Sequence, residues 1–132
     1  MSSIELFKLA DEARKKSYSP YSNITVGAAL LCGSGKVYTG ANIENAAYSP
    51  SVCAERVAIF SAINAGEREF VMIAVAGGKQ GEAAKERFTP CGVCRQVMAE
   101  FCKGDFKVVL SESDTLDFSE LLPHRFDGDK IK

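Results

Sequence analysis

The sequence predicts an α/β protein of three layers, α/β/α, in which helices cover both faces of a mixed sheet of roughly five strands. Three observations lead to this prediction: helical periodicity at the N-terminus, two short apolar runs joined by a glycine turn, and a later alternation of helical and apolar runs. The apolar pair predicts an antiparallel hairpin, and strands separated by helices are expected to be parallel. A chain of 132 residues can form one sizeable core, so we expect a single domain, residues 1–132.

The first third of the chain predicts one helix followed by the hairpin. Ser2 and Glu5 have the spacing of a capping box, and apolar residues then recur at helical spacing to about Ser17. The apolar runs 25–32 and 37–41 predict two strands, because a short turn that contains two glycines separates them.

The rest of the chain alternates helices with apolar runs. The predicted elements are a helix from Ser51 or Val52 to Gly66, a buried strand 70–76, a surface loop 77–89, a helix from Cys91 to Gly104, a strand 106–110, and a short helix from Asp117 or Ser119 to Leu122. This alternation is the reason to expect helices on both faces of the sheet.

Composition excludes several classes of function. The formal net charge is -1, so the basic excess typical of a nucleic-acid-binding protein is missing. No apolar run approaches the roughly 18 residues that span a bilayer, and the first residues lack the basic and apolar regions of a secretion signal. We therefore expect a cytoplasmic protein with a small-molecule partner, and no interaction with nucleic acid or with a membrane.

Two short motifs place three cysteines at predicted helix starts. Cys53 is followed by Glu55 and Arg56, and Cys91 and Cys94 stand one helical turn apart behind a proline. Three thiolates with one vacant coordination position are what a catalytic zinc site requires. Glu55 is expected to be the catalytic residue that moves protons, close to the metal but not bound to it. Arg56 is expected to donate hydrogen bonds to the thiolates.

Two simpler interpretations of the cysteines remain open at this point. Cys91 and Cys94 alone fit a redox pair, although a third cysteine beside an acid weighs against it. A structural zinc site would need a fourth ligand, and the candidates Cys32, Cys102 and His124 lack ligand-like spacing. The odd count of five cysteines argues against a disulfide framework, so Cys32 and Cys102 are expected in the core.

A polar segment follows the predicted hairpin. In extended backbone, side chains two residues apart point to the same side. Asn42 and Glu44 have this spacing, so an amide and a carboxylate are expected to lie side by side next to the second strand.

These motifs resemble the cytidine deaminase family, specifically its short, three-cysteine, homotetrameric type. The resemblance covers nearly the whole chain, and its signature of a non-ligating glutamate beside cysteine ligands is that of the zinc deaminases. It is carried by Pro20-Tyr21-Ser22, Val26-Gly27-Ala28-Ala29-Leu30, Gly40-Ala41-Asn42-Ile43-Glu44-Asn45-Ala46, Cys53-Ala54-Glu55-Arg56, Pro90-Cys91-Gly92-Val93-Cys94-Arg95-Gln96-Val97 and Leu121-Leu122-Pro123.

The resemblance implies roles for individual residues. It implies one zinc ion per subunit, held by Cys53, Cys91 and Cys94. The substrate-binding residues that it implies are Asn42, Glu44, Tyr48, Ala54 and Phe126. Asn42 and Glu44 would bind ribose hydroxyls, and the backbone near Ala54 and Thr89 would meet the pyrimidine. Phe126 would enter the pocket of a neighbouring subunit, so that only a homotetramer completes the site.

The expected function is hydrolytic deamination of cytidine and 2'-deoxycytidine to uridine and 2'-deoxyuridine, with release of ammonia, in pyrimidine salvage. A blasticidin-type deaminase is an alternative, because it shares the metal motifs. A nucleic-acid-editing deaminase is a weaker alternative, because the net charge is slightly negative and the chain is short. Two alternatives lie outside the deaminases: a zinc-stabilised binding module without catalysis, and a thiol-disulfide oxidoreductase.

Overall fold

The computed structural model describes all 132 residues, and its strands form one five-stranded sheet in the order β2-β1-β3-β4-β5. The strands are β1 (Ile24–Cys32), β2 (Val37–Ala41), β3 (Phe70–Lys79), β4 (Lys107–Ser111) and β5 (Asp114–Asp117). β1 pairs antiparallel with both β2 and β3, whereas β3 and β4 are parallel. The predicted mixed sheet is therefore confirmed, with one difference at its edge. β5 turns back antiparallel on β4 and forms a second hairpin, which was not predicted from the sequence.

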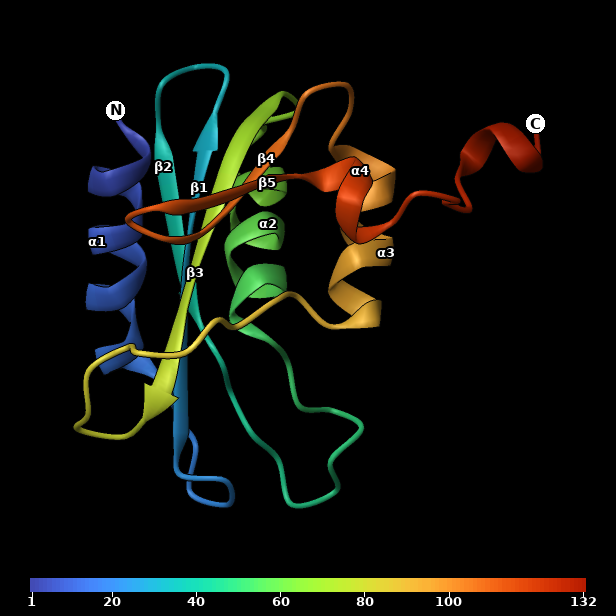
Figure 1. Ribbon diagram of the computed structural model, residues 1–132. Helices are drawn as coiled ribbons and strands as arrows, with labels where there is room; N and C mark the ends of the chain where they lie inside the picture. The colour runs from blue at the N-terminus through green and yellow to red at the C-terminus, as the bar shows by residue number, and fades with distance from the viewer.

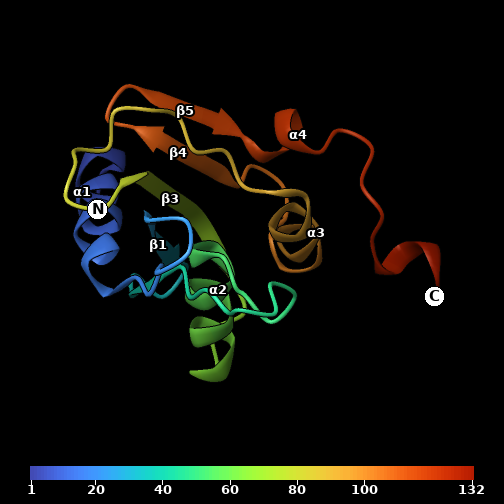
Figure 2. The same cartoon turned by 90° about the horizontal axis from the view of Figure 1, so that it is seen from below.

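The helices lie on both sides of this sheet. They are α1 (Ser3–Ala13), α2 (Ala54–Asn64), α3 (Gly92–Phe101) and the short α4 (Phe118–Leu121). Figure 1 and Figure 2 show α1 alone on one face and α2 with α3 on the other, which is the three-layer arrangement expected from the sequence. None of these helices combines the length and the apolar character needed to cross a membrane.

The two faces of the sheet carry side chains of different size. On β3, the large Ile73 and Val75 pack in the core shared with α2 and α3, whereas Ala74 and Ala76 face α1. Small residues on the α1 side allow the helix to approach the sheet closely. At Gly27 of β1, a Cβ atom would lie 2.0 Å from a backbone oxygen of α1, so this position has no room for a side chain.

Both helices that carry the cysteine motifs begin later than predicted: α2 begins at Ala54 instead of Ser51 or Val52, and α3 begins at Gly92 instead of Cys91. Cys53 and Cys91 are N-cap residues with extended backbone, and the helical turns start at Ala54 and Gly92. Cys94 lies inside the first turn of α3. An N-cap residue has its side chain beside the unpaired N–H groups of the helix start, so the two cysteines still lie at the positive ends of the helix dipoles.

The strand predicted to end at residue 76 continues to Lys79. Gly77, Gly78 and Lys79 pair with residues 24–26 at the start of β1, so pairing with a neighbouring strand extends a segment whose glycines indicate a loop. Phe88 lies against this extension, because a Cβ atom at Gly77 would be 2.6 Å from its ring. The predicted surface loop thus begins at residue 80 and folds back along β3.

Gly40 gives a test of how closely α2 must approach the sheet. A Cβ atom here would lie 2.6 Å from both Ala54 O and Ala58 N, in the first turn of α2. We expect Gly40→Ala to displace this turn and to lower the free energy of unfolding by about 1–3 kcal/mol, measured by urea denaturation. Gly128→Ala is the control, because its Cβ would meet only the flexible Lys132 side chain at 3.9 Å. Equal stability of the two variants would contradict this account.

Candidate active site

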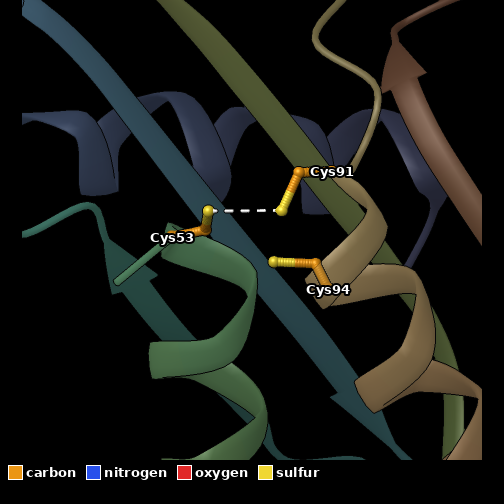
Figure 3. Close-up of side chains that lie close together, drawn as sticks. All are labelled: Cys53, Cys91 and Cys94. Atoms are coloured by element: carbon orange, nitrogen blue, oxygen red, sulfur yellow. Dashed lines mark hydrogen bonds between the residues drawn. The ribbon is translucent and has the colours of Figure 1, made fainter. Parts of the chain in front are cut away.

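The two helix starts bring three sulfur atoms together at one end of the sheet. Cys53 precedes α2, Cys91 precedes α3, and Cys94 follows in the first turn of α3 (Figure 3). The Sγ atoms of Cys53 and Cys91 are 3.6 Å apart, and all three sulfurs lie within 4.8 Å of one another. All five cysteines are free thiols. Segments 38 residues apart in the chain therefore converge on one potential metal site.

The thiols of Cys53 and Cys94 differ strongly in acidity. Hydrogen bonds from Cys94, Arg56 and Cys91 lower the pKa of the Cys53 thiol to about 5. The same pairing with Cys53, together with burial, raises the pKa of the Cys94 thiol. The Cys53 thiolate therefore forms readily, whereas the Cys94 thiol needs a nearby cation in order to ionise. A zinc ion fits this donor set, because thiolates are its preferred soft ligands.

Arg56 supplies a positive charge beside the sulfurs. Its Nη2 atom donates a hydrogen bond to Cys53 Sγ at 3.5 Å, and its Nε is buried with no hydrogen-bond partner. Three thiolates on a divalent ion leave an excess negative charge. The Arg56 guanidinium would offset part of that charge when zinc is bound, and its hydrogen bond to Cys53 is of the kind expected from the sequence.

Glu55 is the buried acid of the site. It is 3% exposed, and burial raises the pKa of its carboxyl to about 7, with the negative charge of Cys53 acting in the same direction. Glu55 is not part of the group of side chains placed to hold a metal. A bound cation would act in the opposite direction on its pKa. The structure thus places a carboxyl near the sulfurs that is free to exchange protons.

A cavity of ≈ 370 Å³ opens over the sulfurs and the acid. This volume falls in the range of about 300–1,000 Å³ that is typical of small-molecule sites. Its apolar lining includes Val26, Val52, Val75 and Phe88. Its other lining residues include Cys53, Glu55, Cys91, Ala54 and Thr89. The cavity therefore has apolar side chains on part of its lining, and the cysteine thiols and the Glu55 carboxyl on another part.

Asn42 and Glu44 lie together at one side of this cavity, as their spacing predicts. Asn42 Oδ1 accepts from Val26 N at 2.9 Å and from Ser17 Oγ at 2.5 Å, and Nδ2 donates to Ile24 O at 3.0 Å. One N–H of the Asn42 amide is left without a protein partner. The amide can therefore donate one hydrogen bond to a ligand.

Glu44 is held as a carboxylate by the turn before β1. Its Oε1 accepts from Tyr21 N at 2.9 Å and Ser22 N at 3.1 Å, and Oε2 accepts from the Ser22 hydroxyl. The hydrogen bond from the Ser22 side chain lowers the pKa of this carboxyl, and the two backbone N–H groups add to the effect. Glu44 thus remains a charged acceptor, in contrast to the buried Glu55.

The structure leaves two of the expected substrate-binding residues outside the cavity of their own chain. Tyr48 is 75% exposed and lines a neighbouring hollow with Tyr21 and Ser51. Phe126 is 56% exposed, and it lies on the C-terminal segment beyond α4. Their roles stay predictions. Conversely, Phe88 lines the cavity and was not expected there, because a lone aromatic in a polar, charged segment gives no signal of its position.

No fourth ligand joins the sulfur group. Cys32 and Cys102 are buried in the core, as expected, and His124 is exposed on the C-terminal segment. None of the three belongs to the group of side chains placed to hold a metal. A closed structural zinc site takes four protein ligands. The observed group supplies only three, so a zinc ion held there would keep one position for water or substrate, and two of the three cysteines line the cavity.

The comparisons with known proteins agree with this geometry. The family model of the cytidine and deoxycytidylate deaminase zinc-binding region matches residues 1–111. This chain belongs to that deaminase family. The cytidine deaminase of Halalkalibacterium halodurans is 47% identical over 130 residues, which cover 96% of this chain and 95% of the relative. The cytidine deaminase of Sporosarcina psychrophila is 41% identical over 131 residues, which cover 96% of this chain and 93% of the relative.

The deaminase fold is equally clear in three dimensions. The crystal structure of cytidine deaminase from Burkholderia pseudomallei matches this chain with a TM-score of 0.85 and 46% sequence identity, over 96% of this chain and 100% of that one. The matching family region is a zinc-binding one, and the structure offers Cys53, Cys91 and Cys94 as its ligand group. Zinc is therefore the cofactor of this deaminase.

Removal of one sulfur tests the zinc site directly. We expect purified protein to hold about one zinc ion per chain, and Cys91→Ala to lose most of it, because two remaining thiolates bind weakly. Metal content after gel filtration with a chelator is the measurement. Cys102→Ala is the control, since this cysteine is buried away from the sulfur group and should leave zinc content unchanged. Full zinc retention by Cys91→Ala would contradict the assignment.

Proposed function

We propose that this chain catalyses the zinc-dependent hydrolytic deamination of cytidine and 2'-deoxycytidine to uridine and 2'-deoxyuridine, with release of ammonia. The observation that carries the proposal is the buried Glu55 carboxyl at a cavity that is also lined by Cys53 and Cys91, two of the three clustered sulfur ligands. Relatives named cytidine deaminase, 47% and 41% identical over nearly their whole length, support the same activity.

Glu55 is the group that moves protons in the proposed reaction. Zinc, when bound, supplies the Lewis acidity that makes water nucleophilic near neutral pH. The Glu55 carboxylate takes a proton from the attacking water as the water oxygen bonds to the ring carbon that bears the amino group, and it gives that proton to the adjacent ring nitrogen. A second proton, from the hydroxyl group so formed, passes through Glu55 to the amino group, so that the carbon–nitrogen bond breaks, ammonia leaves and the ring carbon keeps the oxygen as a carbonyl group. Because Glu55 is 3% exposed, bulk water competes little for these protons.

The apolar wall is suited to hold the pyrimidine over the metal site. Val26, Val75 and Phe88 line the cavity beside Glu55. A flat ring packed against such side chains loses water and is held in one orientation. The backbone at Ala54 and Thr89 lies at the same cavity, where it can meet the polar edge of the base.

Asn42 and Glu44 support a substrate with a free sugar. Asn42 retains one N–H donor, and Glu44 presents a carboxylate acceptor. A sugar hydroxyl both donates and accepts, so this pair matches neighbouring hydroxyl groups. The pair favours a nucleoside over a blasticidin-type substrate.

Loss of cytidine absorbance tests the activity, and Glu55→Gln tests the mechanism. Glutamine keeps the shape of the side chain but cannot carry the proton, so we expect turnover to fall by at least about 100-fold while zinc content is unchanged. Glu100→Gln, an exposed glutamate on α3, should keep full activity.

Three results would count against the proposal. Zinc-loaded wild-type protein that leaves cytidine unchanged would favour a binding module. Preferential turnover of blasticidin would favour the rival deaminase. Undiminished turnover after complete chelation of zinc would remove the metal from the mechanism.

We further propose that the site is completed in a homotetramer, in which the enzyme serves pyrimidine salvage in the cytoplasm. Phe126 supports this proposal, because it is exposed while its carbonyl oxygen is fixed by Gln96 Nε2 at 2.8 Å. The segment beyond α4 extends away from the sheet and helices, as Figure 1 and Figure 2 show. An exposed aromatic on a tethered, projecting segment is suited to contact a second copy of the chain.

Mixed oligomers can show whether Phe126 acts in a neighbouring site. Glu55→Gln and Phe126→Ala chains, carrying different tags, are expressed together and purified for both tags. A site with Glu55 from one chain and Phe126 from another is intact, so we expect the mixture to be several-fold more active than either variant alone. Activity no higher than that of the Phe126→Ala protein would place Phe126 outside the neighbouring site. A monomer in light scattering would exclude the tetramer.

A further inference from the structure

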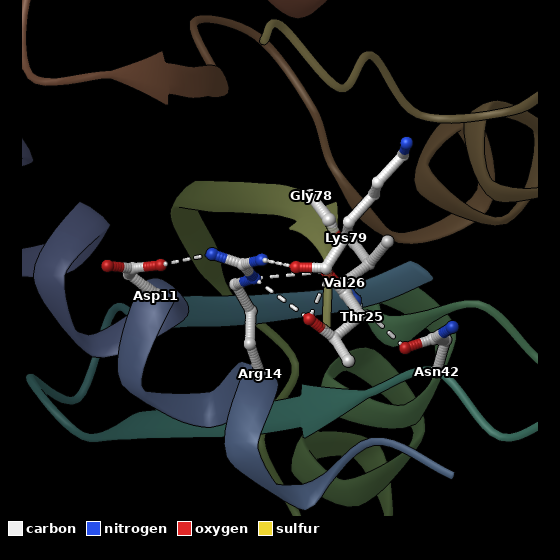
Figure 4. A network of polar contacts seen from close by, with 7 residues as sticks. All are labelled: Asp11, Arg14, Thr25, Val26, Asn42, Gly78 and Lys79. Atoms are coloured by element: carbon white, nitrogen blue, oxygen red, sulfur yellow. Dashed lines mark hydrogen bonds and ion pairs between the residues drawn. The ribbon is translucent and has the colours of Figure 1, made fainter. Parts of the chain in front are cut away.

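Arg14 is a buried cation to which the reaction assigns no role. It follows α1, and its side chain is 8% exposed. Its Nη1 atom donates to Asp11 Oδ1 at 3.0 Å, and its Nη2 donates to Lys79 O at 3.2 Å. Its Nε donates at 3.1 Å to both the carbonyl oxygen and the hydroxyl of Thr25 (Figure 4). One guanidinium thus joins the end of α1 to β1 and β3.

A single peptide unit connects Arg14 with Asn42. The carbonyl oxygen of Thr25, which Arg14 binds, and the N–H of Val26 belong to the same peptide. That N–H donates to Asn42 Oδ1 at 2.9 Å (Figure 4). A charged donor at the carbonyl polarises the peptide and strengthens the hydrogen bond made by its N–H.

The backbone around this peptide fixes which way the Asn42 amide faces. The Val26 N–H requires an acceptor and the Ile24 carbonyl requires a donor, and Asn42 supplies both. If the amide were reversed, its NH2 group would face the Val26 N–H, and its oxygen would face the Ile24 carbonyl oxygen, so neither hydrogen bond could form. Its oxygen is therefore committed to the protein, and its remaining N–H is available to the cavity.

We propose that Arg14 is a positioning residue for the sugar-binding side of the site. It holds the Thr25–Val26 peptide so that Asn42 presents its free N–H to a sugar hydroxyl of the nucleoside. This inference rests on the proposed function for its substrate, whereas the link from Arg14 to Asn42 rests on the hydrogen bonds alone. A rigid guanidinium fork suits this role better than a lysine ammonium, because it binds several acceptors in fixed directions.

The kinetic test is a double-mutant cycle of Arg14→Met and Asn42→Ala. We expect Arg14→Met to raise KM for cytidine by about tenfold, the value of one hydrogen bond, with kcat changed by less than about threefold. In the Asn42→Ala background, Arg14→Met should change KM by less than about twofold, because the residue through which it acts is gone. The inference would be overturned if the effects of the two substitutions on KM were additive, or if Arg14→Met lowered kcat without changing KM.

Two further variants separate positioning from folding. Lys15→Met is the matched control, since Lys15 is 75% exposed and pairs only with Glu12, and it should leave KM unchanged. Arg14→Lys keeps the charge in a variant expected to fold even if Arg14→Met does not. It should still raise KM, by at least about threefold, because it cannot bind all the acceptors. Wild-type KM in Arg14→Lys would overturn the role of the guanidinium fork.

A spectroscopic readout makes the test independent of activity. In isotope-labelled Arg14→Lys, we expect the side-chain amide resonances of Asn42 to shift and the Val26 amide to exchange with solvent faster than in the wild type. Unchanged signals would overturn the inference whatever the kinetics show. An inactive wild-type protein whose Arg14→Lys variant shows the expected shifts would instead refute the proposed function and retain the link.

Discussion

The crowding of three thiols at the starts of two helices is the constraint on which the rest of the site depends. Three thiolates within 4.8 Å of one another would repel one another strongly unless a cation lay among them. Their positions are fixed by packing: α2 begins against Gly40 of β2, where a side chain would collide, and α3 begins behind a buried proline. The packing of the two helix starts against the end of the sheet therefore sets the positions of the metal ligands.

Two glutamates at one cavity show how environment separates their chemistry. Glu55 is buried, and its pKa is raised to about 7, whereas Glu44 accepts hydrogen bonds from the turn before β1, and its pKa is lowered. A carboxyl that can change its protonation near neutral pH suits proton transfer, and one that stays ionised suits binding. The same kind of side chain is thus suited to two different purposes, because Glu55 is buried away from water and Glu44 is surrounded by hydrogen-bond donors.

The helices on the two faces of the sheet contribute different residues to the site and its support. α2 and α3 carry the sulfurs and Glu55 on one face. On the other face, α1 ends in Arg14, which binds β1 and β3 through backbone oxygens. The first residues of β1 lie between these layers, so support from the α1 side reaches the cavity through hydrogen bonds rather than through direct contact.

The sequence by itself determined the three-layer fold, the boundaries of the first hairpin and the zinc-ligand motif. Such features depend on spacing over a few residues: the capping box at Ser2, the strand 37–41, and the alternation of helical and apolar runs. It also indicated that Asn42 and Glu44 would lie together, because alternation along extended backbone is local. It missed β5, a short and largely exposed edge strand without a strong apolar pattern.

Only the tertiary structure decided which distant groups meet. It placed Phe88 over Gly77, the Ser22 hydroxyl on Glu44, and Arg14 on the peptide that orients Asn42. Tertiary packing also carried β3 past its glycines, because β1 offered unpaired backbone groups beside them. The physical reason is the same in each case. A contact between segments far apart in the chain depends on how whole layers pack, and no local pattern of residues encodes that distance.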